Sequence, residues 1–73
     1  MARQEIRSEI TGSVWKVLVQ PGAKVGPDDP LLILESMKME IPVTAEVDAT
    51  VVEVTVKEGE ALNEGALLAV VET

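Results

Sequence analysis

The sequence predicts an all-β fold, a flattened β-barrel or sandwich of two pseudo-symmetric half-repeats at about 6–36 and 43–73. The chain shifted by 37 positions matches itself without a gap. Each copy alternates valine with other residues, as strands do, and then reaches a glycine turn. Because neither half could enclose a core alone, we expect the two halves to face each other within one domain spanning 1–73.

The matched positions define the elements in order. We expect alternating strands at 14–19 and 51–56, turns at Pro21-Gly22 and Glu58-Gly59, and apolar strands at 31–36 and 67–72. Gly22 and Gly59 are expected to supply positive φ angles in their turns. The matched pairs are Ile6/Val43, Ile10/Val47, Val14/Val51, Val17/Val54, Val19/Val56, Gly22/Gly59, Val25/Leu62, Leu31/Leu68 and Glu35/Glu72.

The segment 31–40 carries conflicting signals. Asp29-Pro30 is typical of a helix start, good helix formers follow, and Pro42 would end the helix. The matching segment 67–72 is better suited to a strand, and the repeat therefore predicts strands at 31–36 and 39–44. Met37-Lys38 is then the two-residue turn that joins them.

This turn breaks a local rule. Two-residue hairpin turns need positive φ and favour pairs such as Asn-Gly, so Met-Lys indicates either a functional constraint or a misplaced turn. Lys38 lies between the two half-repeats, and its match in the repeat is Met1. We therefore expect the turn at one end of the fold and the chain termini at the other.

Composition excludes several classes of function. The chain has no cysteine and no histidine, so disulfides, thiol chemistry, zinc fingers and Ser-His-Asp catalysis are excluded. A formal net charge of −7 and a single aromatic residue, Trp15, argue against nucleic-acid binding. No segment reads as a signal peptide or a membrane span, so we expect a soluble, cytoplasmic protein.

The segment Glu35-Ser36-Met37-Lys38-Met39-Glu40 resembles the attachment motif of biotinyl domains, in which lysine lies between two methionines. The similarity extends from about Ile6 to Glu72 and is greatest to small stand-alone biotin carboxyl carrier proteins and biotin/lipoyl attachment proteins. The resemblance implies a barrel-sandwich hybrid fold. It also implies that a biotin protein ligase attaches biotin covalently to Lys38. The biotin would then carry a carboxyl group from a biotin carboxylase to a carboxyltransferase, and the chain itself would be non-catalytic.

The residues beside Lys38 have more than one interpretation. Met37 and Met39 offer adaptable apolar contact for the ligase or for biotin, or they fill the core. Glu35, Ser36 and Glu40 are candidates for ligase recognition. The alternative for Glu35 is a structural role, because it recurs as Glu72. Outside the motif, Trp15 is expected to be a partly covered surface residue, with an interface role as the alternative.

Three departures from the family pattern stand out. Ile10-Thr11-Gly12 occupies the place of a Met-Pro-Gly stretch, which leaves the carboxyltransferase partner open. Asp28 matches Gly65, and we expect Asp28 to tolerate the left-handed conformation that this match implies. No inserted loop forms a thumb over biotin, so the biotin is expected to be less tethered to the surface.

Two other functions compete with this reading. A lipoyl carrier would have the same fold, but its lysine usually lies in Asp-Lys-Ala and not in Met-Lys-Met. An unmodified β-sandwich adaptor would not need Lys38 at all. Autonomous catalysis has no supporting constellation in the sequence.

Overall fold

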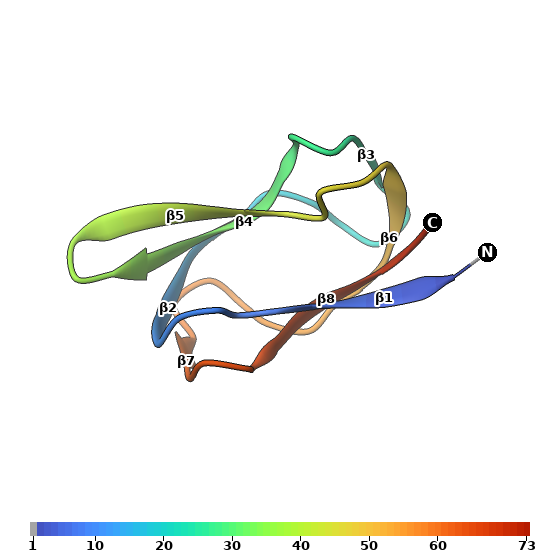
Figure 1. Ribbon diagram of the computed structural model, residues 1–73. Coiled ribbons are helices and arrows are strands. Elements are labelled where there is room, and N and C mark those ends of the chain that lie inside the picture. The colour runs from blue at the N-terminus through green and yellow to red at the C-terminus, as the bar shows by residue number, and fades with distance from the viewer. Residues whose placement is uncertain (1) are drawn as a thin grey trace.

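The chain folds into eight β-strands that form two antiparallel sheets (Figure 1). The computed structural model describes residues 2–73, and within that range it contains no helix, and therefore none long and apolar enough to cross a membrane. The strands are β1 (Arg3–Arg7), β2 (Gly12–Val17), β3 (Lys24–Val25), β4 (Pro30–Ser36), β5 (Met39–Thr44), β6 (Ala49–Val54), β7 (Ala61–Leu62) and β8 (Leu67–Glu72). The all-β prediction is confirmed.

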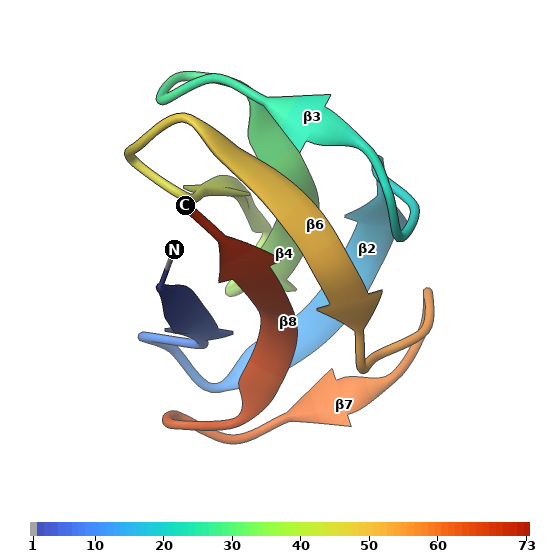
Figure 2. The same cartoon turned by 90° about the vertical axis from the view of Figure 1, so that its right-hand side faces the viewer.

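The two sheets repeat the internal symmetry of the sequence. Their orders are β1-β8-β6-β3 and β5-β4-β2-β7, and the 37-residue shift converts one order into the other. Each sheet contains strands from both half-repeats, and Figure 2 shows β8 and β6 of the second half beside β3 of the first. The halves therefore interleave and do not face each other as separate layers, as the repeat alone had suggested, and each half completes the sheets of the other.

The segment that favoured a helix on local propensity forms β4 and β5. Leu31, Leu32 and Leu34 are buried with no more than 1% of their surface exposed. The β4 register shift around Leu31 lets the adjacent Leu31 and Leu32 both face the core together with Leu34. Burial between the sheets thus outweighs local helix propensity. Pro42 fits because β5 is an edge strand and its missing N–H leaves no partner strand unsatisfied.

Matched β-bulges curve the sheets toward each other. The β4–β5 register shifts around Leu31, and the β1–β8 register shifts opposite its repeat partner Leu68. The β2–β4 register shifts around Trp15, and the β6–β8 register shifts around its repeat partner Val52. Bulges bend a strand and increase its twist, which lets two short sheets close around one core.

The core is made of aliphatic side chains from both halves. Cross-half hydrogen bonds surround it, such as those from Gly22 N to Val51 O (2.7 Å) and from Gly59 N to Val14 O (2.7 Å). Ser8 is the one buried polar side chain among the described residues, and its Oγ donates to Ile10 O at 2.7 Å. The buried apolar residues are Ile6, Val14, Val25, Leu31, Leu32, Leu34, Ala45, Ala49, Val51, Val56, Leu62, Leu68, Ala69 and Val71.

One expected turn conformation is wrong. Gly22 and Gly59 have φ of 95° and 88°, as predicted, and Gly65 has φ of 90°. Asp28, which matches Gly65, does not adopt a positive φ. Its turn is closed by Asp29 N donating to Gly26 O (3.2 Å) and by the Asp29 carboxylate accepting from Gly26 N (2.8 Å). The side chain of Asp29 stabilises a turn that needs no left-handed residue.

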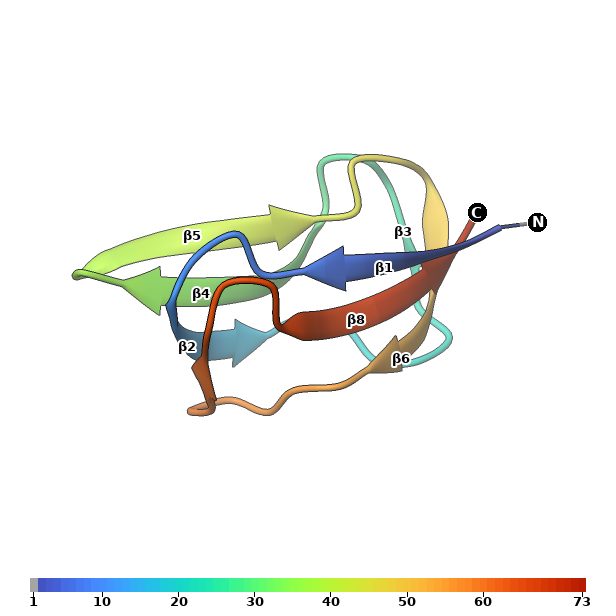
Figure 3. The same cartoon turned by 60° about the horizontal axis from the view of Figure 1, so that its bottom comes forward.

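The Met37-Lys38 turn and the chain termini lie at opposite ends of the fold, as predicted (Figure 3). Ala2 and Thr73 are joined by two backbone hydrogen bonds, with Thr73 N donating to Ala2 O at 2.8 Å. Met1, the repeat partner of Lys38, lies outside the described residues. The molecule measures 35 × 18 × 17 Å, and the β4–β5 hairpin extends along its long direction.

Candidate functional site

The β4–β5 hairpin ends in a two-residue turn formed by Met37 and Lys38. Ser36 pairs with Met39 across the last rung, and Met37 and Lys38 have φ of 52° and 66°. Positive φ at both central residues defines a type I′ turn, whose twist matches that of the flanking strands. For side chains with a Cβ, this conformation costs roughly 1–2 kcal/mol per residue. The predicted turn is confirmed, and its residues are held in a conformation that their chemistry disfavours.

The tip of this hairpin is open to solvent. Met37 is 92% exposed and Met39 is 63% exposed, and Lys38 is exposed between them. The alternative that these methionines fill the core is therefore wrong. Figure 1 shows the hairpin projecting beyond the other strands, so a bulky reagent can approach the Lys38 amine from several sides.

The outward face of the hairpin carries two acidic side chains opposite each other. Glu35 and Glu40 are directly paired residues of β4 and β5, and like charges at such positions destabilise a sheet. At the equivalent place in the other sheet, Arg3 is paired with Glu72, and their side chains form an ion pair at 3.5 Å.

Glu35 and Glu72 are repeat partners, but in the part of the chain that the structure describes only Glu72 of the two forms an ion pair. Position 40 is 37 residues after position 3, so this sheet has glutamate where the other sheet has arginine. Neither Glu35 nor Glu40 forms an ion pair with any residue of the described range 2–73. The structural role of Glu72 is therefore not shared by Glu35, and two carboxylates remain unneutralised beside Lys38.

Ser36 ties the base of the hairpin to the neighbouring loop. Its Oγ donates to Thr11 O at 3.0 Å, and its strand partner Met39 lies on the same side of the hairpin. The side chain is half-buried, so Ser36 is less accessible than the acidic pair. The six motif residues thus lie on one hairpin, with Lys38 at its tip.

Gly12 is a residue of this site that sequence reasoning recognised only as a retained family position. A Cβ on Gly12 would overlap Glu35 O, and it would lie 3.2 Å from Ser36 Cβ. The obstacle is mainly backbone, so it cannot rotate away. Glycine therefore lets the Ile10-Thr11-Gly12 loop approach the base of the attachment hairpin closely.

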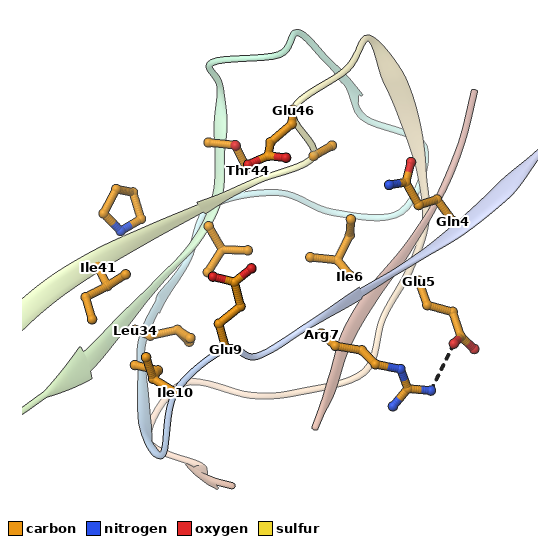
Figure 4. Close-up of a pocket in the computed structure, with 13 residues that line it drawn as sticks. Gln4, Glu5, Ile6, Arg7, Glu9, Ile10, Leu34, Ile41, Thr44 and Glu46 are labelled. Carbon is orange, nitrogen blue, oxygen red and sulfur yellow. Dashed lines mark hydrogen bonds and ion pairs between the residues drawn. The ribbon is translucent and has the colours of Figure 1, made fainter. Parts of the chain in front are cut away.

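A separate groove lies between the edge strands β1 and β5 (Figure 4). It has a volume of about 270 Å³, and its walls include Ile6, Ile41 and the acidic residues Glu9 and Glu46. No lysine lines it. Sequence reasoning missed this groove, because it depends on how far two edge strands of different half-repeats stand apart.

Comparison with known proteins identifies the family. Residues 4–71 match the Biotin_lipoyl family, which is described as "Biotin-requiring enzyme". This chain belongs to the Biotin_lipoyl family. The match covers nearly the whole chain, and it confirms the resemblance inferred from the motif and the repeat.

The relatives include small proteins of similar length. The chain is 46% identical over 68 residues to a biotinylated protein TB7.3 homolog of Mycobacterium leprae, covering 93% of this chain and 96% of that protein. It is 45% identical over 60 residues to a biotin/lipoyl attachment protein of Bacillus subtilis, covering 82% of each.

Solved structures place the same fold inside a much larger enzyme. The chain superposes on part of the urea carboxylase of Kluyveromyces lactis with a TM-score of 0.89 and 32% identity. The match covers 97% of this chain but 6% of that enzyme. The predicted fold class is thus confirmed by a carboxylase segment as well as by the strand arrangement.

Proposed function

We propose that this chain is a biotin carboxyl carrier in which a biotin protein ligase acylates Lys38. The observation that carries the proposal is the type I′ turn, which puts Lys38 at the tip of a projecting hairpin in a member of the Biotin_lipoyl family. The relatives named as biotinylated or biotin/lipoyl attachment proteins support it. We infer that residues 1–73 act as a single carrier domain.

Lys38 is distinguished from the other three lysines of the chain by its place in the fold. Lys16 and Lys24 lie within strands: β2 has β4 and β7 on its two sides, and the edge strand β3 is paired with β6. Lys57 begins a turn, and its N–H donates to the Glu60 carboxylate at 3.1 Å. Lys38 alone among them lies in the two-residue turn of a projecting hairpin, where a large activated ester can reach its amine from beyond the end of the sheet.

In this function the ε-amine of Lys38 forms an amide with the carboxyl group of biotin. Its deprotonated ε-amine attacks the acyl carbon of biotinyl-adenylate, a C–N bond forms, the bond from that carbon to the phosphate oxygen breaks, and AMP leaves with the electron pair. The amine proton is lost to solvent or to a base of the ligase. The positive charge of Lys38 disappears in the step, which leaves a neutral arm beside two carboxylates.

The flanking residues assist recognition in this proposal. The unneutralised carboxylates of Glu35 and Glu40 attract basic groups of the ligase and orient the hairpin tip. Met37 and Met39 provide apolar, adaptable contact around the amine. Ser36 has a smaller part in recognition, because its hydroxyl is engaged with Thr11 O.

The carrier itself is proposed to be non-catalytic. Attached biotin supplies a ureido nitrogen that accepts and releases a carboxyl group. Its partners are a biotin carboxylase and a carboxyltransferase, in keeping with the structural similarity to a urea carboxylase segment. The absence of cysteine agrees with a cytoplasmic setting.

Intact mass measurement tests the proposal. The chain is incubated with a biotin protein ligase, ATP and biotin, and the product is digested and mapped. A single biotinyl increment on the peptide containing Lys38 is the expected result. A folded chain without an increment, or an increment on Lys16, Lys24 or Lys57, would contradict it.

A lipoyl carrier is the second candidate function. The family covers biotin and lipoyl attachment, and the Bacillus subtilis relative carries both in its name. The same mass measurement with a lipoyl ligase and lipoate discriminates the two. If the lipoyl ligase modifies the chain in preference to the biotin ligase, the chain carries lipoate and not biotin.

A further inference from the structure

The outward faces of the two sheets are equivalent by the internal repeat, yet one is more apolar than the other. On the β5-β4-β2-β7 sheet, Trp15 is 41% exposed and Leu18, just beyond β2, is 47% exposed. Their repeat partners on the other sheet are Val52 and Thr55. The same backbone environment thus accepts smaller or more polar residues, and the fold alone does not explain why Trp15 and Leu18 are large and apolar.

The β-bulge in β2 directs Trp15 outward. Val14 before it is buried in the core, and Val17 after it packs against the core, so Trp15 and Lys16 share the outer face between them. The Lys16 ammonium lies 5.5 Å from the centroid of the indole ring. An indole that is partly open to water retains apolar surface that a partner can bury, and tryptophan is enriched among the residues that anchor interfaces.

The face of the sheet that carries this apolar surface also leads to the attachment turn. Ile33 of β4 lies beside Lys16, and Glu35 follows on the same face, opposite Glu40. At a rise of roughly 3.3 Å per residue, Ile33 lies about 10 Å along β4 from Ser36, the last residue before the Met37-Lys38 turn. A standard interface buries about 800 Å² on each partner, so one protein surface can cover Lys38 and Trp15 together.

The enzyme that acylates Lys38 fits this surface better than the enzymes that use the finished arm. Its active site must reach the amine itself, so it must lie against the hairpin. Enzymes that use the arm meet a group held away from the domain. The two unneutralised carboxylates next to the apolar residues call for a partner with basic groups beside an apolar slot.

We propose that a strip on the outer face of the β5-β4-β2-β7 sheet is the docking surface for the biotin protein ligase. The strip consists of Trp15, Leu18, Ile33, Glu35 and Glu40, with Lys16 between the indole and Ile33. This inference rests on the proposed function, and it adds a distant anchor, Trp15, to the recognition of Lys38. The ligase contributes an apolar slot for the indole and cations for the two glutamates.

A variant that makes the strip resemble its repeat partner tests the proposal. Trp15→Val together with Leu18→Thr introduces the residues that the second half-repeat has at the same positions. Biotinylation rates are measured over a range of carrier concentrations. We expect kcat/KM to fall about tenfold or more through a raised KM, with kcat within about twofold of the parent chain, because the changes are remote from the amine.

The matched control is Val52→Thr, which changes the bulge position on the opposite sheet. It should leave kcat/KM unaltered. Circular dichroism during urea unfolding shows that each variant is folded under the labelling conditions. An unaltered kcat/KM in the double variant, or an equal fall in Val52→Thr, would overturn the proposal while Lys38 labelling of the parent chain still upheld the carrier function. If the parent chain itself is not labelled, both the docking proposal and the proposed carrier function are wrong.

A direct measurement follows the indole itself. Lys38→Arg carrier with 5-fluorotryptophan at position 15 has a single fluorine resonance, because the chain has one tryptophan. Adding unlabelled ligase should shift or broaden that resonance, and excess unlabelled parent chain should reverse the effect. An unchanged resonance at ligase concentrations above KM would refute the assignment. A parent chain that dimerises in sedimentation through Trp15 would instead assign the strip to a second copy.

Discussion

Replacing Gly12 with alanine tests whether the loop before β2 supports the attachment hairpin. The new Cβ would overlap Glu35 O and press on Ser36 Cβ, which lies 3.2 Å from the Cβ position. Overpacking of this kind costs roughly 1–3 kcal/mol. Alanine also reduces the conformational entropy of the unfolded chain, which raises the free energy of unfolding by about 0.4–1 kcal/mol. We therefore expect Gly12→Ala to lower the free energy of unfolding by about 1–2 kcal/mol.

The chain offers a matched control for the same substitution. At Gly26 the nearest atom to a new Cβ is Asp29 Oδ2 at 3.4 Å, an ordinary contact, and the residue has no positive φ. Only the effect on the unfolded chain should remain, so Gly26→Ala should be neutral or stabilising by up to about 1 kcal/mol. The repeat partner of Gly12 is Ala49, so the other half accepts a Cβ at the equivalent position.

Urea unfolding and thermal unfolding, followed by Trp15 fluorescence and circular dichroism, measure the stability of both variants. For a domain of this size, 1 kcal/mol corresponds to a Tm change of about 4–8 °C, so the expected loss is easily detected. If Gly12→Ala is as stable as Gly26→Ala, the close approach of the loop to the hairpin is not a constraint, and the explanation given for the retained glycine is wrong.

The remaining predictions concern the hairpin itself. Lys38→Arg should fold like the parent chain yet take up no biotin in the mass assay, because guanidinium is not a usable nucleophile; uptake by this variant would place the modification elsewhere. Changing Met37 and Met39 to glutamine should slow biotinylation and leave the urea midpoint unaltered, since both side chains are exposed; unchanged labelling kinetics would show that neither methionine is recognised. Glu40→Lys should stabilise the hairpin by about 0.2–1 kcal/mol through a new pair with Glu35 but reduce kcat/KM for the ligase at low salt. A labelling rate that is equal or higher in Glu40→Lys would show that the acidic pair does not guide the ligase.

The repeat, more than local propensity, made the fold predictable. Residues 31–40 read as a helix in isolation, and only their match to 67–72 turned the prediction toward two strands and a Met37-Lys38 turn. The match works because both segments bury side chains at the same positions, which are Leu31, Leu32 and Leu34 in one and Leu68, Ala69 and Val71 in the other. The turn was predictable for a related reason, since the strands predicted at 31–36 and 39–44 leave only Met37 and Lys38 between them.

Some features of the hairpin had a signal that sequence reasoning did not use. Aligning position 3 with position 40 sets arginine against glutamate, which already indicates that the Arg3–Glu72 pair has no counterpart beside Lys38. For Asp28, which lies in the turn before β4, the repeat gave a misleading signal. Its match to Gly65 suggested a left-handed residue, but the carboxylate of Asp29 closes the turn in another way.

The sequence by itself determined the all-β class, the longer strands β2, β4, β5, β6 and β8 and the place of Lys38 between the halves, because these depend on side-chain alternation and on the repeat along the chain. The strands β1, β3 and β7 were not predicted. Only the tertiary structure decided that each sheet takes strands from both halves, that Gly12 lies against the backbone of Glu35, and that Trp15 shares a face with the attachment hairpin. These features depend on distances between segments far apart in the chain. Such distances are set by how the core packs and how bulges bend the strands, and no local pattern records them.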